Sequence, residues 1–280
     1  MNYIELLKNS ADKFSSIVCF GMDPVIEDIP EKGTGNGEII FKFYENILNE
    51  LIKKNILPGA VKPNYAFYAQ YGLEGIATLE KLIKIYKSAG IPVILDYKRG
   101  DIGKTAAAYS REAFDFFDAD AVTLSPYLGY DSIEPYIKGF PEKGYYILTK
   151  TSNSSSGQLQ DLKIDNKELF LHVAELIIQW YHPGIGSVAG ATYPEQLSQI
   201  SNIFEKSGKE IPFLIPGVGT QGGSLQEVMA VLKKSKDIRI HRINASSSIN
   251  YAYKKYNGIH YAEAAVIALK EMNEEIEGLK

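Results

Sequence analysis

Short apolar runs alternate along the chain with longer segments in which apolar residues recur at helical spacing. The short runs are rich in β-branched and aromatic residues and end in polar residues or glycine, which is typical of buried strands. Eight such runs occur, at residues 17–22, 59–65, 92–97, 121–125, 145–149, 187–191, 212–216 and 238–244. The amphipathic segments predict helices at residues 39–53, 75–88, 105–117, 167–181, 194–207, 224–234 and 259–276.

Eight strand–helix units predict a (β/α)8 TIM barrel, an α/β fold, with residues 1–280 as a single domain. The length of 280 residues fits, because single barrels often run to about 250 residues. An open doubly wound sheet is the alternative. It would concentrate polar motifs after two strands, whereas polar clusters follow nearly every run here. Residues 152–165 are rich in Ser, Asn and Gly without apolar periodicity, which predicts a mobile active-site loop.

Composition and charge narrow the class of protein. Hydrophobic residues make up 45% and charged residues 23%, which excludes a largely disordered chain and a bundle of membrane helices. The 30 basic and 34 acidic residues give a net charge of −4, so we expect no nucleic-acid partner. The single cysteine, Cys19, lies in the first predicted strand as a packing residue and fits a reducing compartment. The first residues lack a signal-peptide pattern, so we expect a cytoplasmic protein without membrane association.

Four charged residues gather around the second and third predicted strands. Asp96 and Lys98 are two residues apart at the end of a strand, where alternation places both side chains on one face. Lys62 ends the preceding strand, and Asp101 lies in the turn after Lys98. In a barrel, this end of the strands is the mouth of the active site. The pattern predicts either a catalytic charge array or a salt-bridge network that closes the barrel end. The cost of burying charges favours the catalytic array.

Four segments together resemble the orotidine 5′-phosphate decarboxylase family, and more narrowly its longer, type 2 branch. They are FGMDP at 20–24, VKPN at 61–64, LDYKRGDIGKT at 95–105 and PGVGTQGG at 216–223. They occur in the family's order, one per strand end, and the resemblance extends over about residues 17–250. It implies an enzyme that converts orotidine 5′-monophosphate (OMP) to UMP and CO2 in pyrimidine biosynthesis, without a metal or other cofactor.

The resemblance also implies roles for individual residues. Lys62, Asp96, Lys98 and Asp101 would form a catalytic tetrad. Asp101 would enter the site of the neighbouring subunit, so that a homodimer shares its active sites. The implied substrate contacts are Asp23 and Asn64 at the ribose, Ile102 and Thr105 across the dimer interface, Thr151 and Ser152 at the pyrimidine, Pro216 at the ring edge, and Gly219, Gln221, Gly222 and Ser247 at the phosphate.

The implied chemistry explains these residue types. Loss of CO2 from orotate leaves an electron pair at C6 in the plane of the ring, where the π-system cannot delocalise it. A fixed cation at this position stabilises the developing charge without an electron sink. Lys98 would be this cation and would donate the proton to C6, while flanking carboxylates keep it protonated. Binding of the distant phosphate would help to close the mobile loop.

Residues 217–222 spell G-x-G-x-x-G between a predicted strand and a predicted helix, a pattern also found in dinucleotide-binding folds. Such a fold would place an acidic residue at the end of the next strand, but that strand leads into INASSS at 243–248. A barrel phosphate site, built from backbone N–H groups after the seventh and eighth strands, explains the glycines better. A simple tight turn is the remaining alternative.

One position departs from the family pattern. After the eighth strand the family usually places an arginine that grips the phosphate, in a pattern such as NSSRGI. The chain has NASSSI at 244–249, with Ser247 at the position of the arginine. A hydroxyl cannot replace the bidentate, charge-assisted contacts of a guanidinium. Arg239 and Arg242 lie nearby in the sequence. We therefore expect an intact catalytic centre with a weakened phosphate anchor.

Two other functions stay open. One is a metal-dependent phosphosugar decarboxylase or aldolase of the same barrel superfamily, which shares D-x-K-x-x-D but needs added carboxylate ligands. This chain has Lys62 and Asn64 where such a ligand would lie, and its histidines show no metal-binding spacing. The other is a non-catalytic nucleotide-binding relic, which Ser247 suggests and the intact tetrad opposes.

Overall fold

Eight parallel strands form a closed ring in the computed structural model, which describes residues 1–219, 222–256 and 258–280. The strands of the ring are β1 (Val18–Met22), β2 (Ala60–Pro63), β3 (Ile94–Arg99), β4 (Ala121–Leu124), β5 (Gly144–Lys150), β8 (Ile185–Ala189), β9 (Phe213–Ile215) and β10 (Arg242–Ala245). Their order is β2-β1-β10-β9-β8-β5-β4-β3. Backbone bridges between Val61 and Val93 and between Asn64 and Asp96 join β2 to β3. The predicted (β/α)8 barrel is confirmed.

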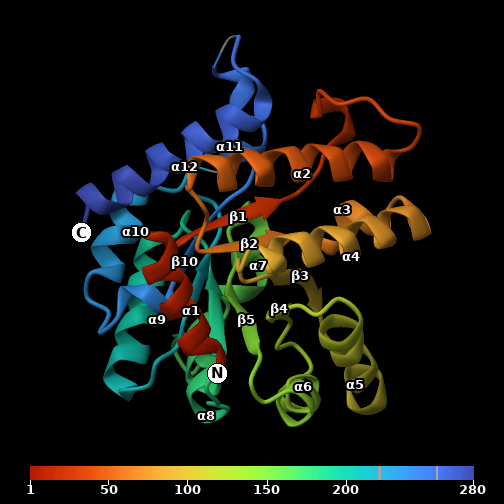
Figure 1. The fold of residues 1–280 in the computed structure, drawn as a ribbon. Helices are drawn as coiled ribbons and strands as arrows, with labels where there is room; N and C mark the ends of the chain where they lie inside the picture. Colours follow the sequence, from red (N-terminus) through yellow and green to blue (C-terminus); the bar gives the residue numbers. More distant parts are fainter. Residues whose placement is uncertain (220–221, 257) are drawn as a thin grey trace.

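Helices surround the ring of strands (Figure 1). The α-helices are α1 (Tyr3–Phe14), α2 (Asn36–Lys54), α3 (Tyr65–Ala69), α4 (Gly72–Ser88), α5 (Gly103–Arg111), α6 (Glu134–Gly139), α7 (Gly157–Gln160), α8 (Leu169–Gln179), α9 (Pro194–Ser207), α10 (Leu225–Leu232), α11 (Ser247–Asn250) and α12 (Tyr261–Gly278). Shorter turns are η1 (Ile26–Asp28), the π-helix η2 (Glu112–Phe116), η3 (Tyr130–Ser132), η4 (Ser154–Ser156), η5 (Ile238–Ile240) and η6 (Ala252–Lys254). Within the described residues, no helix combines the length and apolar character needed to span a membrane.

Helix α1 covers one end of the barrel and lies in front of the strands in Figure 1. A capping box between Asn2 and Glu5 starts this helix. Its Tyr3 packs with Cys19 and Tyr146 in a buried cluster, and the Tyr3 hydroxyl donates to the Tyr146 hydroxyl at 3.1 Å. Burial raises the pKa of the Cys19 thiol to about 12, which suits a packing role. This end of the barrel is therefore filled, and a site must lie at the other end.

Arg242 ties α1 to the barrel at the same filled end. Its side chain is fully buried, and it makes its hydrogen bonds to neutral acceptors. These acceptors are the carbonyl oxygens of Leu7, Gly59, Arg239 and His241 and the hydroxyl of Ser10. The guanidinium of Arg239 instead pairs with Asp12 and Asp237. Both arginines are thus engaged in structural contacts.

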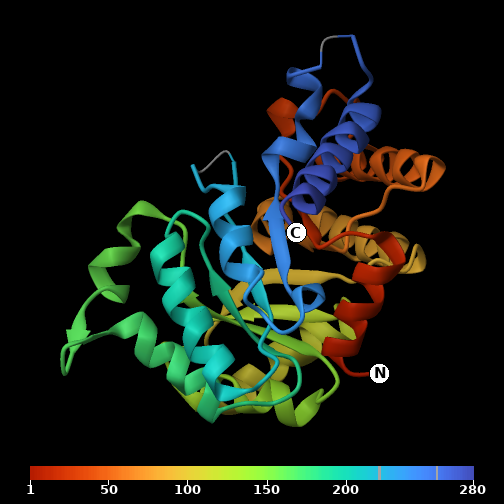
Figure 2. The same ribbon diagram turned by 90° about the vertical axis from the view of Figure 1, so that its left-hand side faces the viewer.

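The segment predicted as a mobile loop contains short elements, η4, α7 and β6 (Lys163–Ile164), which pairs antiparallel with β7 (Lys167–Glu168). It projects on the left of Figure 2, away from α1 on the right. At its base, Lys150 donates to Asp161 Oδ1 at 2.6 Å with only 1% of its side chain exposed. The carboxamide of Gln160 accepts from the Thr151 N–H at 2.9 Å and donates to the Thr151 hydroxyl at 2.8 Å. The base is anchored, and mobility of the rest stays a prediction.

The last strand begins later in the structure than the sequence predicts. Residues 238–240 form the turn η5, and β10 begins only at Arg242. Asp237 causes this difference, because its carboxylate accepts from the Arg239 N–H at 3.0 Å and closes the turn. The apolar pattern also failed to predict α1, α3 and α6, although the other main helices lie close to their predicted positions.

Candidate active site

A cavity of about 540 Å³ lies at the carboxyl ends of the strands. The predicted site residues that line it are Asp23, Lys62, Asn64, Asp96, Lys98, Thr151, Ser152, Pro216 and Ser247. Further lining residues that sequence reasoning missed are Val25, Phe67, Thr123, Leu148, Asn153, Val188, Leu214, Gly217, Val218, Asn244, Ser246 and Tyr251. Residues distant in sequence meet here because all parallel strands end at the same edge.

Asp96 is the centre of the charged array. Its Oδ2 accepts from Lys62 Nζ at 2.8 Å, and its Oδ1 accepts from Lys98 Nζ at 2.6 Å and from Thr123 Oγ1 at 2.8 Å. The side chains of Lys62 and Asp96 are only 6% and 7% exposed, whereas that of Lys98 is 48% exposed. One carboxylate therefore orients two ammonium groups, and only Lys98 extends toward the open part of the cavity.

The electrostatics of this array keep Lys62 and Asp96 charged. Burial alone would raise the pKa of Asp96, but the ammonium groups of Lys62 and Lys98 hold it well below its usual range. Burial likewise opposes charge on Lys62, yet the carboxylates of Asp96 and Asp23 raise the pKa of Lys62 above its usual value. Lys62 and Asp96 are therefore a fixed pair of opposite charges at neutral pH.

Lys98 has an unusual backbone for a residue in a strand. Its φ is 48°, in the left-handed region, and its N–H donates to Thr123 Oγ1 at 3.0 Å. The pairing of β3 with β4 shifts register between Leu95 and Arg99. Asp96 and Lys98 line one cavity as predicted, but regular alternation is not the reason. An irregular strand end, held by Thr123, directs Lys98.

Thr123 had one sequence signal, because it places a hydroxyl between two apolar residues, Val122 and Leu124, in the fourth run.

Two polar side chains in the cavity wall have an oxygen that is free to bind a ligand. Within the described part of the chain, Asp23 Oδ1 and Asn244 Oδ1 are buried without a hydrogen-bond partner. Tyr251 holds the segment after β1 in place, because its hydroxyl accepts from the Val25 N–H at 2.7 Å and donates to the Asp23 carbonyl at 3.2 Å. The free oxygens of Asp23 and Asn244 are suited to bind donors of a ligand, such as hydroxyl groups.

The glycine-rich segment after β9 forms a tight turn. Gly217 and Gly219 have φ values of 96° and 77°, which other residues rarely adopt. The N–H of Gly219 donates to Gly223 O, that of Gly222 to Gly219 O, and that of Gly223 to Gly217 O. These three amides are thus used inside the turn. Gln221, predicted at the phosphate, lies outside the described residues. Gly219 and Gly222 do not line the main cavity.

The cationic groups near the expected phosphate end are few. Among the described residues that line the main cavity, Lys62 and Lys98 are the basic ones. Gly219 lines an adjoining cavity of about 660 Å³ that shares Ser247 with the main one. Its lysines, Lys254 and Lys255, pair with Asp28 and Glu271. Arg239 and Arg242 are held at the other end of the barrel. No arginine in the described chain thus replaces the one absent at position 247.

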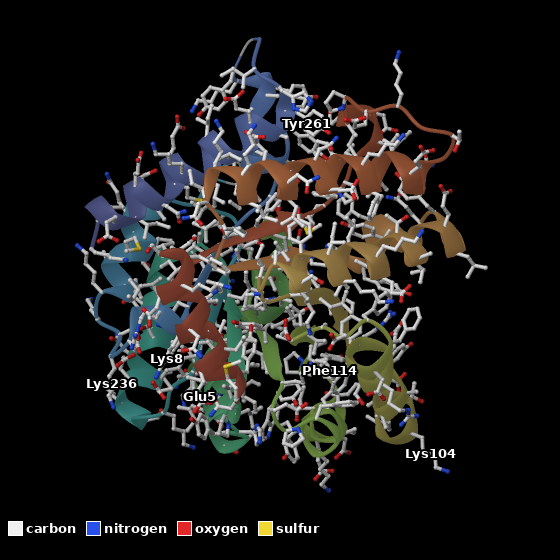
Figure 3. All side chains as sticks on the ribbon, viewed as in Figure 1. Glu5, Lys8, Lys104, Phe114, Lys236 and Tyr261 are labelled. Carbon is white, nitrogen blue, oxygen red and sulfur yellow. The ribbon has the colours of Figure 1, made fainter. Side chains whose placement is uncertain are left out.

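Asp101, Ile102 and Thr105 lie outside the cavity. Asp101 accepts from the Ile102 N–H at 2.8 Å, and the Ile102 side chain is 52% exposed. Thr105 is exposed in the first turn of α5, beside Lys104, which points away from the molecule in Figure 3. The chain by itself does not bring Asp101 to Lys98.

The fold and the site together define a TIM-barrel enzyme with a lysine–carboxylate centre in its mouth. The sequence model of the Orotidine 5′-phosphate decarboxylase / HUMPS family matches residues 46–273, and the chain belongs to this family.

Individual relatives match over nearly their whole length. The chain is 39% identical to a protein named orotidine 5′-phosphate decarboxylase from Roseiflexus castenholzii, covering 99% of this chain and 97% of that protein. It is 39% identical to a protein of the same name from Herpetosiphon aurantiacus, covering 94% and 93%. The solved structure of Leishmania donovani OMP decarboxylase has a TM-score of 0.80 at 31% identity, covering 100% and 98%.

Proposed function

We propose that this protein decarboxylates OMP to UMP and CO2 in pyrimidine biosynthesis, with neither metal nor organic cofactor. The observation that carries the proposal is the Lys62–Asp96–Lys98 array in the cavity of a barrel whose relatives bear this enzyme's name. The array supplies a preorganised cation beside a carboxylate, which is what a localised carbanion at C6 requires.

In the proposed mechanism, Lys98 performs the chemical step. The C6–CO2 bond breaks, CO2 leaves, and the electron pair stays on C6, where the Lys98 ammonium stabilises it. Lys98 then donates a proton to C6, which completes UMP. Asp96 and Thr123 hold the lysine before the reaction, so that little reorganisation is needed as charge develops. Lys62 neutralises Asp96 and keeps this carboxylate in place.

The remaining contacts follow the cavity wall. Asp23 and Asn64 bind the ribose, and the free Oδ1 of Asp23 supports this assignment because it can accept from a hydroxyl. Thr151 and Ser152 bind the pyrimidine, Pro216 borders the ring, and Ser247 lies toward the phosphate. Assignment of Gly219 and Gly222 to the phosphate requires that the turn open, because the amides of both glycines are used internally. The assignment of Gln221 to the phosphate rests on the resemblance.

We further propose a cytoplasmic homodimer with shared sites. Asp101 lies outside the cavity of its own chain, so it is available to complete the site of a partner. Exposed apolar side chains that follow β3 and β4 support such an interface. Ile102 is 52% exposed, and Tyr127 and Leu128 after β4 are 79% and 47% exposed. Ile102 and Thr105 would then contact the partner's substrate.

The decisive experiment follows the loss of orotidylate absorbance on adding the purified protein, with and without excess chelator. We expect turnover that survives the chelator and disappears in Lys98→Ala. Turnover that the chelator abolishes would support a metal-dependent reaction instead. Absence of turnover at millimolar OMP would leave the nucleotide-binding relic, which a UMP-binding measurement would then identify.

A further inference from the structure

Arg99, one residue beyond Lys98, lies in a cage of aromatic rings. Its guanidinium carbon is 4.9 Å from the ring centroid of Tyr65, 5.1 Å from that of Tyr97 and 4.5 Å from that of Tyr109. Its Nη2 lies 3.6 Å from Glu112 Oε2, and 27% of each side chain is exposed. The reaction proposed above assigns no role to this residue. The cage is nevertheless built from four elements, α3, β3, α5 and the π-helix η2.

Two residues of the cage, Tyr65 and Tyr97, lie next to site residues around Asp96. Tyr65 directly follows Asn64, whose backbone forms a bridge with Asp96. Tyr97 lies between Asp96 and Lys98 in the chain, and its hydroxyl donates to the Tyr136 hydroxyl at 3.0 Å. The Arg99 guanidinium, in cation–π contact with these rings, therefore joins the ends of β2 and β3 to α5.

Lys98 needs such support, because a non-glycine residue with positive φ is unfavourable unless its surroundings fix it. On its N-terminal side, Asp96 and Thr123 hold the backbone and the ammonium. On its C-terminal side, the Arg99 carbonyl accepts from the Ser125 N–H at 2.7 Å, and the Arg99 side chain is held in the cage. Lys98 is thus clamped between two anchors.

We propose that Arg99 is a positioning residue that fixes the backbone of Lys98, and with it the Lys98 ammonium beside Asp96. The same anchor sets the direction of the chain toward Asp101, two residues further on. The inference rests on the proposed function. A guanidinium is broad and flat enough to lie within about 5 Å of three ring centroids while its N–H groups face Glu112, whereas a compact ammonium is not, so lysine is a poor substitute here.

The test compares Arg99→Lys and Arg99→Ala with the wild type and with Arg111→Lys, a control on the exposed end of α5. We expect Arg99→Lys to lower kcat by about 10–100-fold, the effect of a small misplacement of a reacting group, with a much smaller change in KM for OMP. Added guanidinium should restore part of the kcat of Arg99→Ala, whereas ammonium should not. Arg111→Lys should match the wild type.

A purely structural role predicts a different result: less folded protein or a lower Tm, with unchanged kcat per folded site. That outcome, or wild-type kinetics in Arg99→Lys, would overturn the proposal. Failure of the proposed function is separate, because the wild type itself would then show no turnover. In that case crystal structures of wild type and Arg99→Lys still decide. We expect loss of the 2.6 Å contact between Lys98 and Asp96 in the variant, and an unchanged contact would reject the inference.

Discussion

Lys62 and Asp96 form an ion pair of 2.8 Å that solvent hardly reaches, with side chains 6% and 7% exposed. The pair matters because the second oxygen of the same carboxylate holds Lys98. Removing the charge of Asp96 should therefore affect both the stability of the barrel mouth and the position of the Lys98 ammonium.

Asp96→Asn should lower kcat by about 10²–10³-fold, the usual effect of losing a preorganised charge contact. It should also lower the free energy of unfolding by about 3–5 kcal/mol, because the Lys62 ammonium stays buried without its carboxylate. Steady-state kinetics and urea unfolding at pH 7 measure both effects. Asp118→Asn is the control, since Asp118 pairs with Lys87 at the surface.

The pH dependence of this difference has a definite sign. The pKa of Asp96 is lower in the folded chain than in the unfolded chain, so its stabilising contribution is complete above about pH 4. It is lost only as the pH falls toward the folded-state pKa. The stability gap between wild type and Asp96→Asn should thus stay constant from pH 5 to 8. A gap that closes within this range would contradict the buried ion pair.

A shared active site predicts complementation between inactive chains. Lys98→Ala and Asp101→Ala should each be nearly inactive alone. After subunit exchange, random pairing makes half of the dimers mixed, each with one intact site, so activity should reach about a quarter of wild type. Mixing Lys98→Ala with Lys62→Ala is the control and should recover nothing, because both lysines line the same chain's cavity. No recovery in the first mixture would argue against Asp101 acting across the interface.

Ser247→Arg should strengthen binding of the phosphate. A charge-assisted contact contributes about 1.5–3 kcal/mol, so KM for OMP should fall by about 10–100-fold at unchanged kcat. Ser248→Arg is the control, since Ser248 lines only the adjoining cavity. Neither variant should improve binding of orotidine, which lacks the phosphate. An unchanged KM in Ser247→Arg would mean that this turn does not face the phosphate.

The sequence predicted the barrel and nine of the residues that line the cavity, its charged residues among them, because these depend on local patterns. Apolar runs that end in polar residues locate strand ends, and in a barrel all such ends share one mouth. The capping box of Asn2 and Glu5 could also have indicated α1. The left-handed backbone of Lys98 has no such local signal, since the contacts around it come from other elements: Thr123 accepts from the Lys98 N–H, and Tyr65 and Tyr109 contact Arg99. Likewise, the G-x-G-x-x-G pattern does not show that the N–H groups of Gly219, Gly222 and Gly223 bond to carbonyls of the same turn, because these bonds depend on the folded backbone.

The anchored base of residues 152–165 leads to a prediction on substrate binding. The Lys150 ammonium is almost fully buried and donates to Asp161, next to Gln160, which binds Thr151. Asp161→Asn should therefore raise KM for OMP about 10-fold, equal to about 1.4 kcal/mol, close to the lower end of the range of about 1.5–3 kcal/mol for a hydrogen bond to a charged group. Faster amide hydrogen exchange in the segment should accompany it. Asp165→Asn, an exposed position in the same segment, should change neither quantity.

His241 should make the barrel less stable in mild acid. Its Nδ1 accepts from the Phe213 N–H at 3.0 Å, and burial lowers its pKa to about 3. An unfolded histidine has a pKa of about 6.5, so protonation favours the unfolded chain as the pH falls from 7 toward 3. This one residue should remove about 2 kcal/mol of stability between pH 7 and pH 5.

His241→Asn keeps an acceptor for the Phe213 N–H but cannot bind the proton. Its free energy of unfolding, measured with urea, should therefore fall less than that of the wild type between pH 7 and pH 5. His172→Asn on α8 should follow the wild-type curve, because the His172 ring is not buried in the barrel. Parallel curves for His241→Asn and wild type would mean that His241 does not titrate as a buried neutral ring. The loss of stability in acid would then come from the carboxylates. For Asp96, the difference in free energy of unfolding between wild type and Asp96→Asn would narrow only below about pH 4.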